Sequence, residues 1–245
     1  LVMDIQARFD DPGTLYHENP ALCAADGQLT HSAIMGDIVH LPSGGVSLNV
    51  DILASAPIER LDIFNGLDHV ETIRPYSDVE LGNRIRVIWE GAEYRGRFRQ
   101  VIWDGSATFS GTKIERHCAI NFFNRDKTID RVGEDTLKWR ALTTGNIGGF
   151  DVWLSKNNGG SLKLDTPLVT LDLPLSEIGY EDHYTDAGGL SRGVRIFRLP
   201  EENTHRSMRI ERRIEINNAG DNPLFVRVTQ EDGHLAWSSP IYVYR

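Results

Sequence analysis

Apolar and polar side chains alternate at period two in a long series of short segments from residue 46 to the C-terminus. Residues 46–53, Val-Ser-Leu-Asn-Val-Asp-Ile-Leu, show the pattern clearly, since every second side chain is apolar. Gly, Asn, Asp and Pro separate these segments at close spacing, and only residues 77–81 and 175–178 could each form one helical turn. The sequence therefore predicts an all-β fold, one or more antiparallel β-sandwiches of well over ten short strands with very little helix. A parallel α/β sheet is excluded because its crossovers need long helices.

Turn residues and sequence similarity predict how some of these strands pair. Asn65-Gly66 is expected to join residues 58–65 and 70–74 in a β-hairpin. Residues 84–89 and 97–103 both end in Val-Ile-Trp, and we expect them to form a second pair connected through the residues between them. The sandwich is thus predicted to consist largely of local hairpins.

Charge is unevenly distributed along the 245 residues, which carry 26 Lys+Arg, 35 Asp+Glu and a formal net charge of −9. Residues 1–45 hold one cation, Arg8, against six carboxylates, and they are interrupted by several Pro and Gly residues. We expect residues 1–45 to be a junction segment, with a strand over 1–8 and a long irregular connection after it. Residues 46–245 are expected to form the sandwich domain, with room for two packed sub-sandwiches. The strand-like start indicates a fragment that follows a missing N-terminal domain.

Net charge and hydrophobicity argue against nucleic acids and membranes as partners. A net negative chain lacks the electrostatic footprint of a protein that binds nucleic acid or anionic lipid. No apolar run approaches the roughly 18 residues of a membrane-spanning helix, and the N-terminus lacks a signal-peptide pattern. We therefore expect a soluble chain with no nucleic-acid or membrane partner, cytoplasmic or exported. Cys118 lies in an alternating segment and is expected to be a buried free thiol.

The sequence contains none of the following common catalytic motifs. The eight histidines show no HxH, HxxxH or HExxH spacing, and no Gly-x-Ser-x-Gly elbow occurs. The glycine-rich run at residues 145–149 leads into a strand, so no helix N-terminus is available to bind a phosphate. We predict no catalytic residue and no metal ligand in this chain. A group of early side chains could converge on a divalent ion, although a solvated acidic loop is favoured: Asp10, Asp11, His17, Glu18 and Cys23.

Aromatic and basic residues supply the candidates for ligand binding. Five tryptophans could form a carbohydrate platform, but each lies in an alternating strand, which favours core packing instead. Arginines are concentrated between residues 84 and 99, where a solvated strand face is favoured over an anion site. The candidate ligand-binding residues are Trp89, Arg95, Arg97 and Trp103.

Six stretches together carry a resemblance to a known family. They are AIMGD (33–37), APIERL (56–61), RIRVIWEGAEYRGR (84–97), TTGN (143–146), FVRVTQEDG (225–233) and AWSSPIYV (236–243). In combination they resemble the C-terminal half of a large family of uncharacterised proteins, catalogued as a domain of unknown function. The N-terminal half of that family is similar to the polymerase and histidinol phosphatase (PHP) superfamily of metal-dependent phosphoesterases. The resemblance covers nearly the whole chain from about residue 33.

The resemblance implies an accessory role. The family's presumed chemistry lies in the PHP half, where an early His-x-His and carboxylates hold divalent metals (Mn, Zn or Fe), and this sequence has no His-x-His. The implied function is a noncatalytic β-domain without a cofactor of its own, for domain docking, oligomerisation or cleft shaping. Its partners would be the PHP-like domain of the same protein and further copies of the chain. The alternative is a free-standing module that binds carbohydrate or another small ligand; an independent hydrolase using the early His and Asp residues is a third hypothesis.

Overall fold

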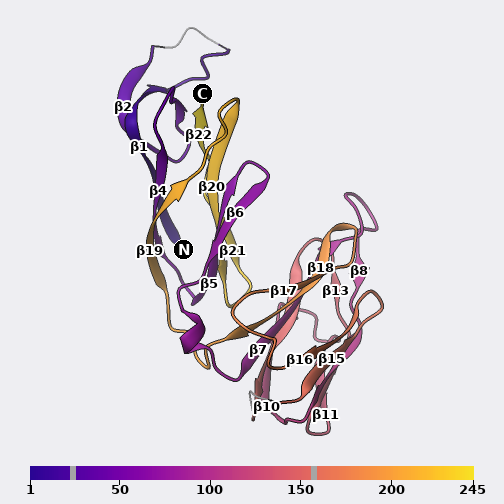
Figure 1. Cartoon of the computed structure of the whole chain (residues 1–245). Helices are drawn as coiled ribbons and strands as arrows, with labels where there is room; N and C mark the ends of the chain where they lie inside the picture. Colours follow the sequence, from indigo (N-terminus) through magenta and orange to yellow (C-terminus); the bar gives the residue numbers. More distant parts are fainter. Residues whose placement is uncertain (23–25, 156–158) are drawn as a thin grey trace. The chain divides into compact units, whose positions relative to one another are not determined.

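The computed structural model describes residues 1–22, 26–155 and 159–245. These residues form 22 strands and a single turn of 3-10 helix, η1 (Asp78–Glu80), which confirms the predicted all-β class (Figure 1). The chain divides into two compact units. Unit 1 contains residues 1–75 and 204–245, and unit 2 is inserted between them as residues 76–203. The described residues include no helix with the length and hydrophobicity required to cross a bilayer.

Unit 1 contains ten strands from both ends of the chain. They are β1 (Val2–Tyr16), β2 (Gln28–Ile34), β3 (Ile38–His40), β4 (Val46–Leu53), β5 (Ile58–Asn65), β6 (Asp68–Ile73), β19 (Ser207–Ile214), β20 (Asp221–Gln230), β21 (Leu235–Trp237) and β22 (Ile241–Tyr244).

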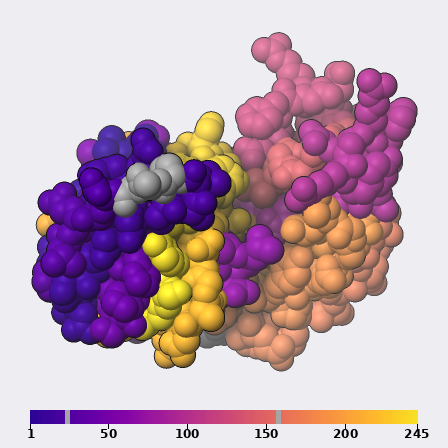
Figure 2. All heavy atoms as spheres, turned by 90° about the horizontal axis from the view of Figure 1, so that it is seen from above, coloured from indigo at the N-terminus to yellow at the C-terminus, as the bar shows by residue number. Residues whose placement is uncertain are grey.

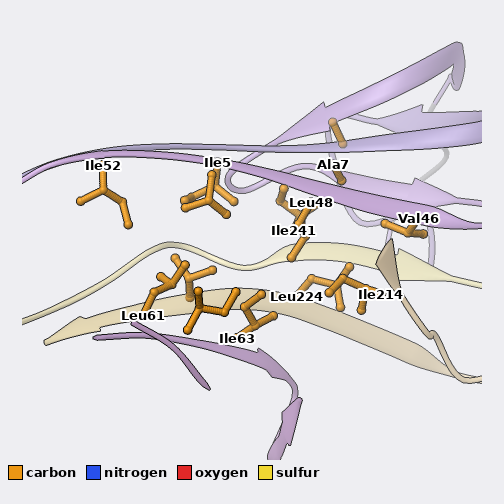
Figure 3. Packing of buried hydrophobic residues seen from close by; sticks show 14 of the residues in the cluster. Ile5, Ala7, Val46, Leu48, Ile52, Leu61, Ile63, Ile214, Leu224 and Ile241 are labelled. Carbon is orange, nitrogen blue, oxygen red and sulfur yellow. The ribbon is translucent and has the colours of Figure 1, made fainter. Parts of the chain in front are cut away.

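The main strand order of unit 1 is β19-β4-β1-β3-β22-β20-β5-β6. The sheet folds over into two layers, and apolar side chains from both layers meet between them (Figure 3). Ile5 and Leu48 contribute from β1 and β4, while Leu61 and Leu224 contribute from β5 and β20, and all four are fully buried. The period-two pattern thus produces the expected sandwich, because one face of each strand supplies the core.

The N-terminal residues differ from the expected junction segment. The first strand does not end at residue 8 but continues to Tyr16, with an irregularity between Arg8 and Gly13. Its first part pairs with β4 and its last part pairs with β3, so this strand connects the two layers. Residues 1–22 and 26–45 therefore belong to unit 1, and the observed division of the chain lies near residues 75 and 204 rather than at residue 45.

Unit 2 contains the other twelve strands. They are β7 (Arg84–Ala92), β8 (Val101–Ile102), β9 (Gly105–Ser110), β10 (Ile114–Ile120), β11 (Ile129–Val132), β12 (Thr136–Trp139), β13 (Leu142–Thr143), β14 (Ile147–Leu154), β15 (Ser161–Asp165), β16 (Thr170–Pro174), β17 (His183–Asp186) and β18 (Leu190–Leu199).

Two five-stranded antiparallel sheets form unit 2, in the orders β10-β14-β7-β18-β17 and β11-β12-β9-β15-β16. Their core combines residues such as Val87 and Phe150 from the first sheet with Phe109 and Leu162 from the second. Strands β8 and β13 form a separate short ladder. This unit is therefore a second β-sandwich with its own hydrophobic core.

Local pairing was predicted correctly at one hairpin and wrongly at another. Strands β5 and β6 pair around Gly66, whose φ of +61° suits the turn. By contrast, β7 pairs with β14 and β18, far away in sequence, while β8 pairs with β13. The predicted hairpin between residues 84–89 and 97–103 is thus wrong, because β7 is the central strand of its sheet and its two edges are occupied by those partners.

The expectation for Cys118 is also wrong, since its thiol is exposed. Strand β10 lies at the edge of its sheet, and its register with β14 shifts between Ile114 and Arg116. An edge strand with a register shift does not keep a simple alternation of core and solvent positions, which explains the error.

Candidate ligand-binding site

The candidate tryptophans Trp89 and Trp103 lie in the core of unit 2. Their side chains are 1% and 0% exposed, respectively. The indole of Trp89 stacks on that of Trp139, with ring centroids 5.1 Å apart and an interplanar angle of 7°. Neither Trp89 nor Trp103 can offer a ring face to a sugar, so the hypothesis of an exposed tryptophan platform fails for this pair, and the core interpretation is correct for both.

The indole N–H groups of the buried tryptophans nevertheless differ in one respect. Trp103 Nε1 donates to Thr143 Oγ1 at 2.9 Å, and Trp139 Nε1 donates to the Trp103 carbonyl oxygen at 2.5 Å. Trp153 Nε1 donates to the Glu201 carbonyl oxygen at 3.0 Å. Within the described residues, these three donors are satisfied, as buried polar groups normally are.

Trp89 is the exception. Its Nε1 is buried and has no hydrogen-bond partner in the part of the chain that the structure describes. A buried donor without a partner costs about 1–3 kcal/mol, so an unsatisfied group of this kind calls for an explanation.

A cavity of about 220 Å³ borders the Trp89 side chain. This volume is below the roughly 300–1,000 Å³ of pockets for drug-sized ligands, so the cavity suits a ligand of about one ring. Its walls come from the loop after β10, the turn around β13 and the start of β14. The lining residues are Trp89, Asn121, Phe122, Phe123, Asn124, Lys127, Arg140, Ala141, Leu142, Asn146 and Gly148.

Gly148 allows β14 to pass close to the indole edge of Trp89. It is paired with Trp89 across the β7–β14 ladder, and both residues line the cavity. A Cβ atom at position 148 would lie only 2.7 Å from Trp89 Nε1. The close packing of β14 against the unsatisfied N–H therefore requires a residue without a side chain at position 148.

Hydrogen bonds hold the loop after β10 in place. Asn121 has a φ of +58°, a left-handed conformation that asparagine tolerates better than most residues, and its Nδ2 donates to the Ile147 carbonyl oxygen at 3.1 Å. Arg140 donates to the Asp126 carbonyl oxygen at 2.9 Å, and Lys127 N donates to the Asn124 carbonyl oxygen at 3.0 Å. The polar walls of the cavity are thus fixed by a hydrogen bond to β14, by one from Arg140 after β12 and by one within the loop itself.

The charge of the lining is positive. Lys127 and Arg140 border the cavity, neither forms an ion pair among the described residues, and the described lining contains no carboxylate. The two cations and the Trp89 N–H are donors, and three asparagine amides add further donor and acceptor groups to the walls. Such a site suits a ligand rich in acceptor oxygens, above all one carrying a carboxylate or another anionic group.

Apolar side chains complete the walls. Phe122 contacts Trp89 edge to face, with centroids 6.0 Å apart, whereas Phe123 is 81% exposed at the rim. Leu142 is also partly exposed there. The Phe123 ring can contact the apolar face of a small molecule, while the polar groups beside it bind the polar face of the same molecule.

The remaining candidates, Arg95 and Arg97, lie outside this cavity. Both are exposed in the loop between β7 and β8. The arginines of β7 behave differently, because Arg84 and Arg86 are buried and donate to Asp151 at 2.5 and 2.7 Å. Burial opposes ionisation of Asp151, but the two guanidinium groups outweigh it and lower the pKa of this carboxyl group. The predicted basic stretch therefore splits into a buried ion-pair network and an exposed loop.

Sequence reasoning missed most of the cavity residues. Asn121, Lys127 and Arg140 lie in segments that read as ordinary turns or strand ends. The glycine-rich run at residues 145–149 was the available signal, since its Gly148 permits the close approach of β14 to Trp89. The run offers no phosphate site because a strand follows it, and the contact of Gly148 with Trp89 depends on strand register, which the run itself does not show.

The early acidic residues do not form a metal centre in the described chain, where no group of three or more His, Cys, Asp or Glu side chains could hold an ion. The Arg213 guanidinium donates to Asp10 at 2.8 and 2.5 Å and lowers the pKa of Asp10 to about 2. Asp11 accepts a hydrogen bond from Ser43 Oγ at 2.8 Å. Cys23 lies outside the described residues.

Comparisons with protein-family models, with curated proteins and with solved structures give no match to this chain. The resemblance to the PHP-linked family stays a prediction, and the candidate site rests on its geometry.

Proposed function

We propose that this chain is a noncatalytic β-sandwich protein whose second unit binds a small anionic ligand, of the size of one sugar ring, in the cavity beside Trp89. The observation that supports this most directly is the buried Trp89 N–H without a partner, which borders a cavity that also holds Lys127 and Arg140. A ligand carboxylate would accept from the indole and neutralise the two cations. This proposal develops the alternative of a carbohydrate- or small-ligand-binding module.

The test is a titration of the indole N–H resonances by two-dimensional NMR. Glucuronate and glucose form a matched pair of probes, because they differ at one carbon, which carries a carboxylate in the first and a hydroxyl in the second. Trp89→Phe assigns the Trp89 resonance, and the exposed Trp237 serves as an internal reference in unit 1. We expect glucuronate to shift the Trp89 resonance saturably, with at least tenfold weaker binding of glucose and no shift at Trp237.

Inorganic phosphate and galacturonate extend the panel to other anionic groups. If none of the anionic probes shifts the Trp89 resonance saturably, the binding proposal is refuted. Equal affinity for glucuronate and glucose would refute the assignment of an anionic ligand.

A second proposal keeps the accessory role in a larger protein. Phosphoesters are anionic, so a donor-lined cavity is compatible with a domain that helps a PHP-like phosphoesterase recruit its substrate. In this proposal the divalent metals and the chemistry belong to the other domain. Hydrolysis of a phosphoester by the purified chain with added Mn or Zn, lost on chelation, would contradict the noncatalytic assignment in both proposals.

A further inference from the structure

The loop over residues 93–100, between β7 and β8, is the most concentrated group of exposed cations and aromatics in the described chain. It reads Glu-Tyr-Arg-Gly-Arg-Phe-Arg-Gln, and every residue in it is exposed. Arg95, Arg97 and Arg99 form no ion pair among the described residues. Phe98 is 86% exposed. We call residues 93–100 the arginine loop.

The arginine loop is a closed structure with an anchored base. Glu93 N donates to the Arg99 carbonyl oxygen at 3.1 Å, which closes the loop, and the Glu93 carboxylate pairs with Arg192 on β18. An exposed segment that is tied at its base loses less conformational entropy when it binds a partner.

Hydrogen bonds connect this base to the rim of the Trp89 cavity. The Gly91 carbonyl oxygen accepts from Thr143 Oγ1 at 2.7 Å and from Gly145 N at 3.1 Å. These two donors are the sequence neighbours of Leu142 and Asn146, which both line the cavity. The loop and the cavity therefore lie at the same end of unit 2.

Partly exposed apolar side chains lie between them. Ile102 on β8 is directly opposite Leu142 on β13, so both project from the same face of that short ladder, and both are at least 40% exposed. Figure 2 shows the magenta segment that includes the arginine loop and the pink segment near residue 120 projecting on the same side, with a hollow between them. The β8–β13 ladder thus connects the cavity lining at Leu142 with the end of the arginine loop, which β8 follows directly in the chain.

We propose that the cavity and the arginine loop together bind an acidic oligosaccharide, with one charged sugar in the cavity and the following units along the β8–β13 ladder and the arginine loop. This inference rests on the proposed function of the cavity. The volume of about 220 Å³ holds about one ring, so the loop arginines would contact later anionic units of the same chain. Repeated charges on a polymer match three separate guanidinium groups better than a single small anion does.

A sugar chain fits this surface better than a single-stranded nucleic acid. Base stacking needs accessible aromatic faces, and the Trp89 ring beside the cavity is buried against Trp139. Phe98 and Phe123, by contrast, are exposed, so a nucleic acid is the competing outcome that the test includes. The asparagine amides of the lining can both donate to and accept from sugar hydroxyl groups.

The experiment measures binding of galacturonate, its trimer and its hexamer to the whole chain by calorimetry and by the Trp89 indole resonance. The test variant combines Arg95→Gln, Arg97→Gln and Arg99→Gln. A control variant removes the same charge from exposed positions on the second sheet of unit 2, with Arg131→Gln, Lys138→Gln and Lys163→Gln. A thymidine 20-mer is the nucleic-acid probe.

We expect the hexamer to bind the wild type at least about tenfold more tightly than the monomer, with a gain that decreases at high salt. The test variant should lose this gain and keep monomer binding, while the control variant keeps both. A hexamer no tighter than the monomer, or a gain that survives in the test variant, overturns the inference while the single-ring site stands. A hexamer that binds without shifting the Trp89 resonance overturns the inference and also counts against the cavity. Tighter binding of the 20-mer than of the hexamer assigns the loop to nucleic acid instead and overturns the oligosaccharide assignment.

Discussion

Replacing Gly148 with alanine provides the sharpest test of how the cavity is built. Residue 148 lies in β14, and its backbone does not adopt a left-handed φ, so alanine introduces no backbone strain there. The new methyl group would lie 2.7 Å from Trp89 Nε1 and 3.4 Å from Cε2. The whole effect of the substitution therefore comes from the collision with the indole edge.

The size of the effect follows from these distances. Carbon contacts are most favourable at about 3.5–4.0 Å, so the indole has to withdraw by roughly 1 Å. The Trp89 ring is stacked on Trp139 with centroids 5.1 Å apart, and this stack belongs to the core of unit 2. Overpacking of this kind typically costs about 1–3 kcal/mol, and we expect Gly148→Ala to lower the free energy of unfolding by that amount.

Ligand binding should fall as well, because the methyl group displaces the indole edge that borders the cavity. Loss of the hydrogen bond from the indole N–H weakens binding of glucuronate by about tenfold, equivalent to about 1.4 kcal/mol. Urea denaturation measures the first effect, and the Trp89 indole titration measures the second.

Gly179→Ala is the matched control. A Cβ atom at position 179 meets nothing within 4 Å, and the backbone there is also not left-handed. Alanine at this position should leave stability unchanged or raise it by about 0.4–1 kcal/mol, since it restricts the unfolded chain. If Gly148→Ala resembles Gly179→Ala in both assays, the close approach of β14 to Trp89 is not what shapes the cavity.

Three further predictions concern ionised groups. Asp151→Asn should destabilise the chain by about 3–5 kcal/mol in urea denaturation, because it leaves two buried guanidinium groups without their carboxylate. Folding lowers the pKa of Asp151, so the ionised carboxylate stabilises the folded state fully above the unfolded pKa of about 3.9. This stabilisation is lost as the pH falls through the folded pKa. The wild type should therefore lose more stability on acidification than the Asp151→Asn variant. Asp62→Asn should cost about 1–3 kcal/mol by the same assay, since the buried Asp62 carboxylate accepts hydrogen bonds from Thr72 and Arg227 in unit 1. Arg213→Gln should raise the pKa of Asp10 from about 2 toward its ordinary value, and an unchanged titration of Asp10 by NMR would contradict the assigned pair.

Fold class was accessible from sequence because the alternation of side chains is a local property. In residues 46–53 the apolar side chains identify the inward face of the strand, and the structure places every second side chain of β4 in the core. The hairpin of β5 and β6 could also be predicted, since its turn at Gly66 directly connects the two strands. Where pairing is distant, as for β7 with β14, local sequence contains no signal for the partner.

The candidate site could be predicted only in part, because its walls come from separate segments of unit 2. Alternation indicates that Trp89 points inward, but it does not show whether the indole N–H finds an acceptor. That depends on Thr143 being near Trp103 and on Gly148 being near Trp89, and both are consequences of strand register. Exposure of the arginine loop likewise follows from β7 ending at Ala92, which the apolar pattern did not define.

The position of the cavity within unit 2 follows from the way the chain enters and leaves that unit. Arg84 at the start of β7 is paired with Leu199 at the end of β18, so both connections to unit 1 leave from one end of these central strands. Trp89 lies toward the opposite end of β7, where Gly91 is bonded to the turn around β13. Loops at the end of a sandwich can vary in sequence without disturbing the strands that form its core. The loops at this end of unit 2 include the cations and exposed aromatic rings on which the proposed function depends.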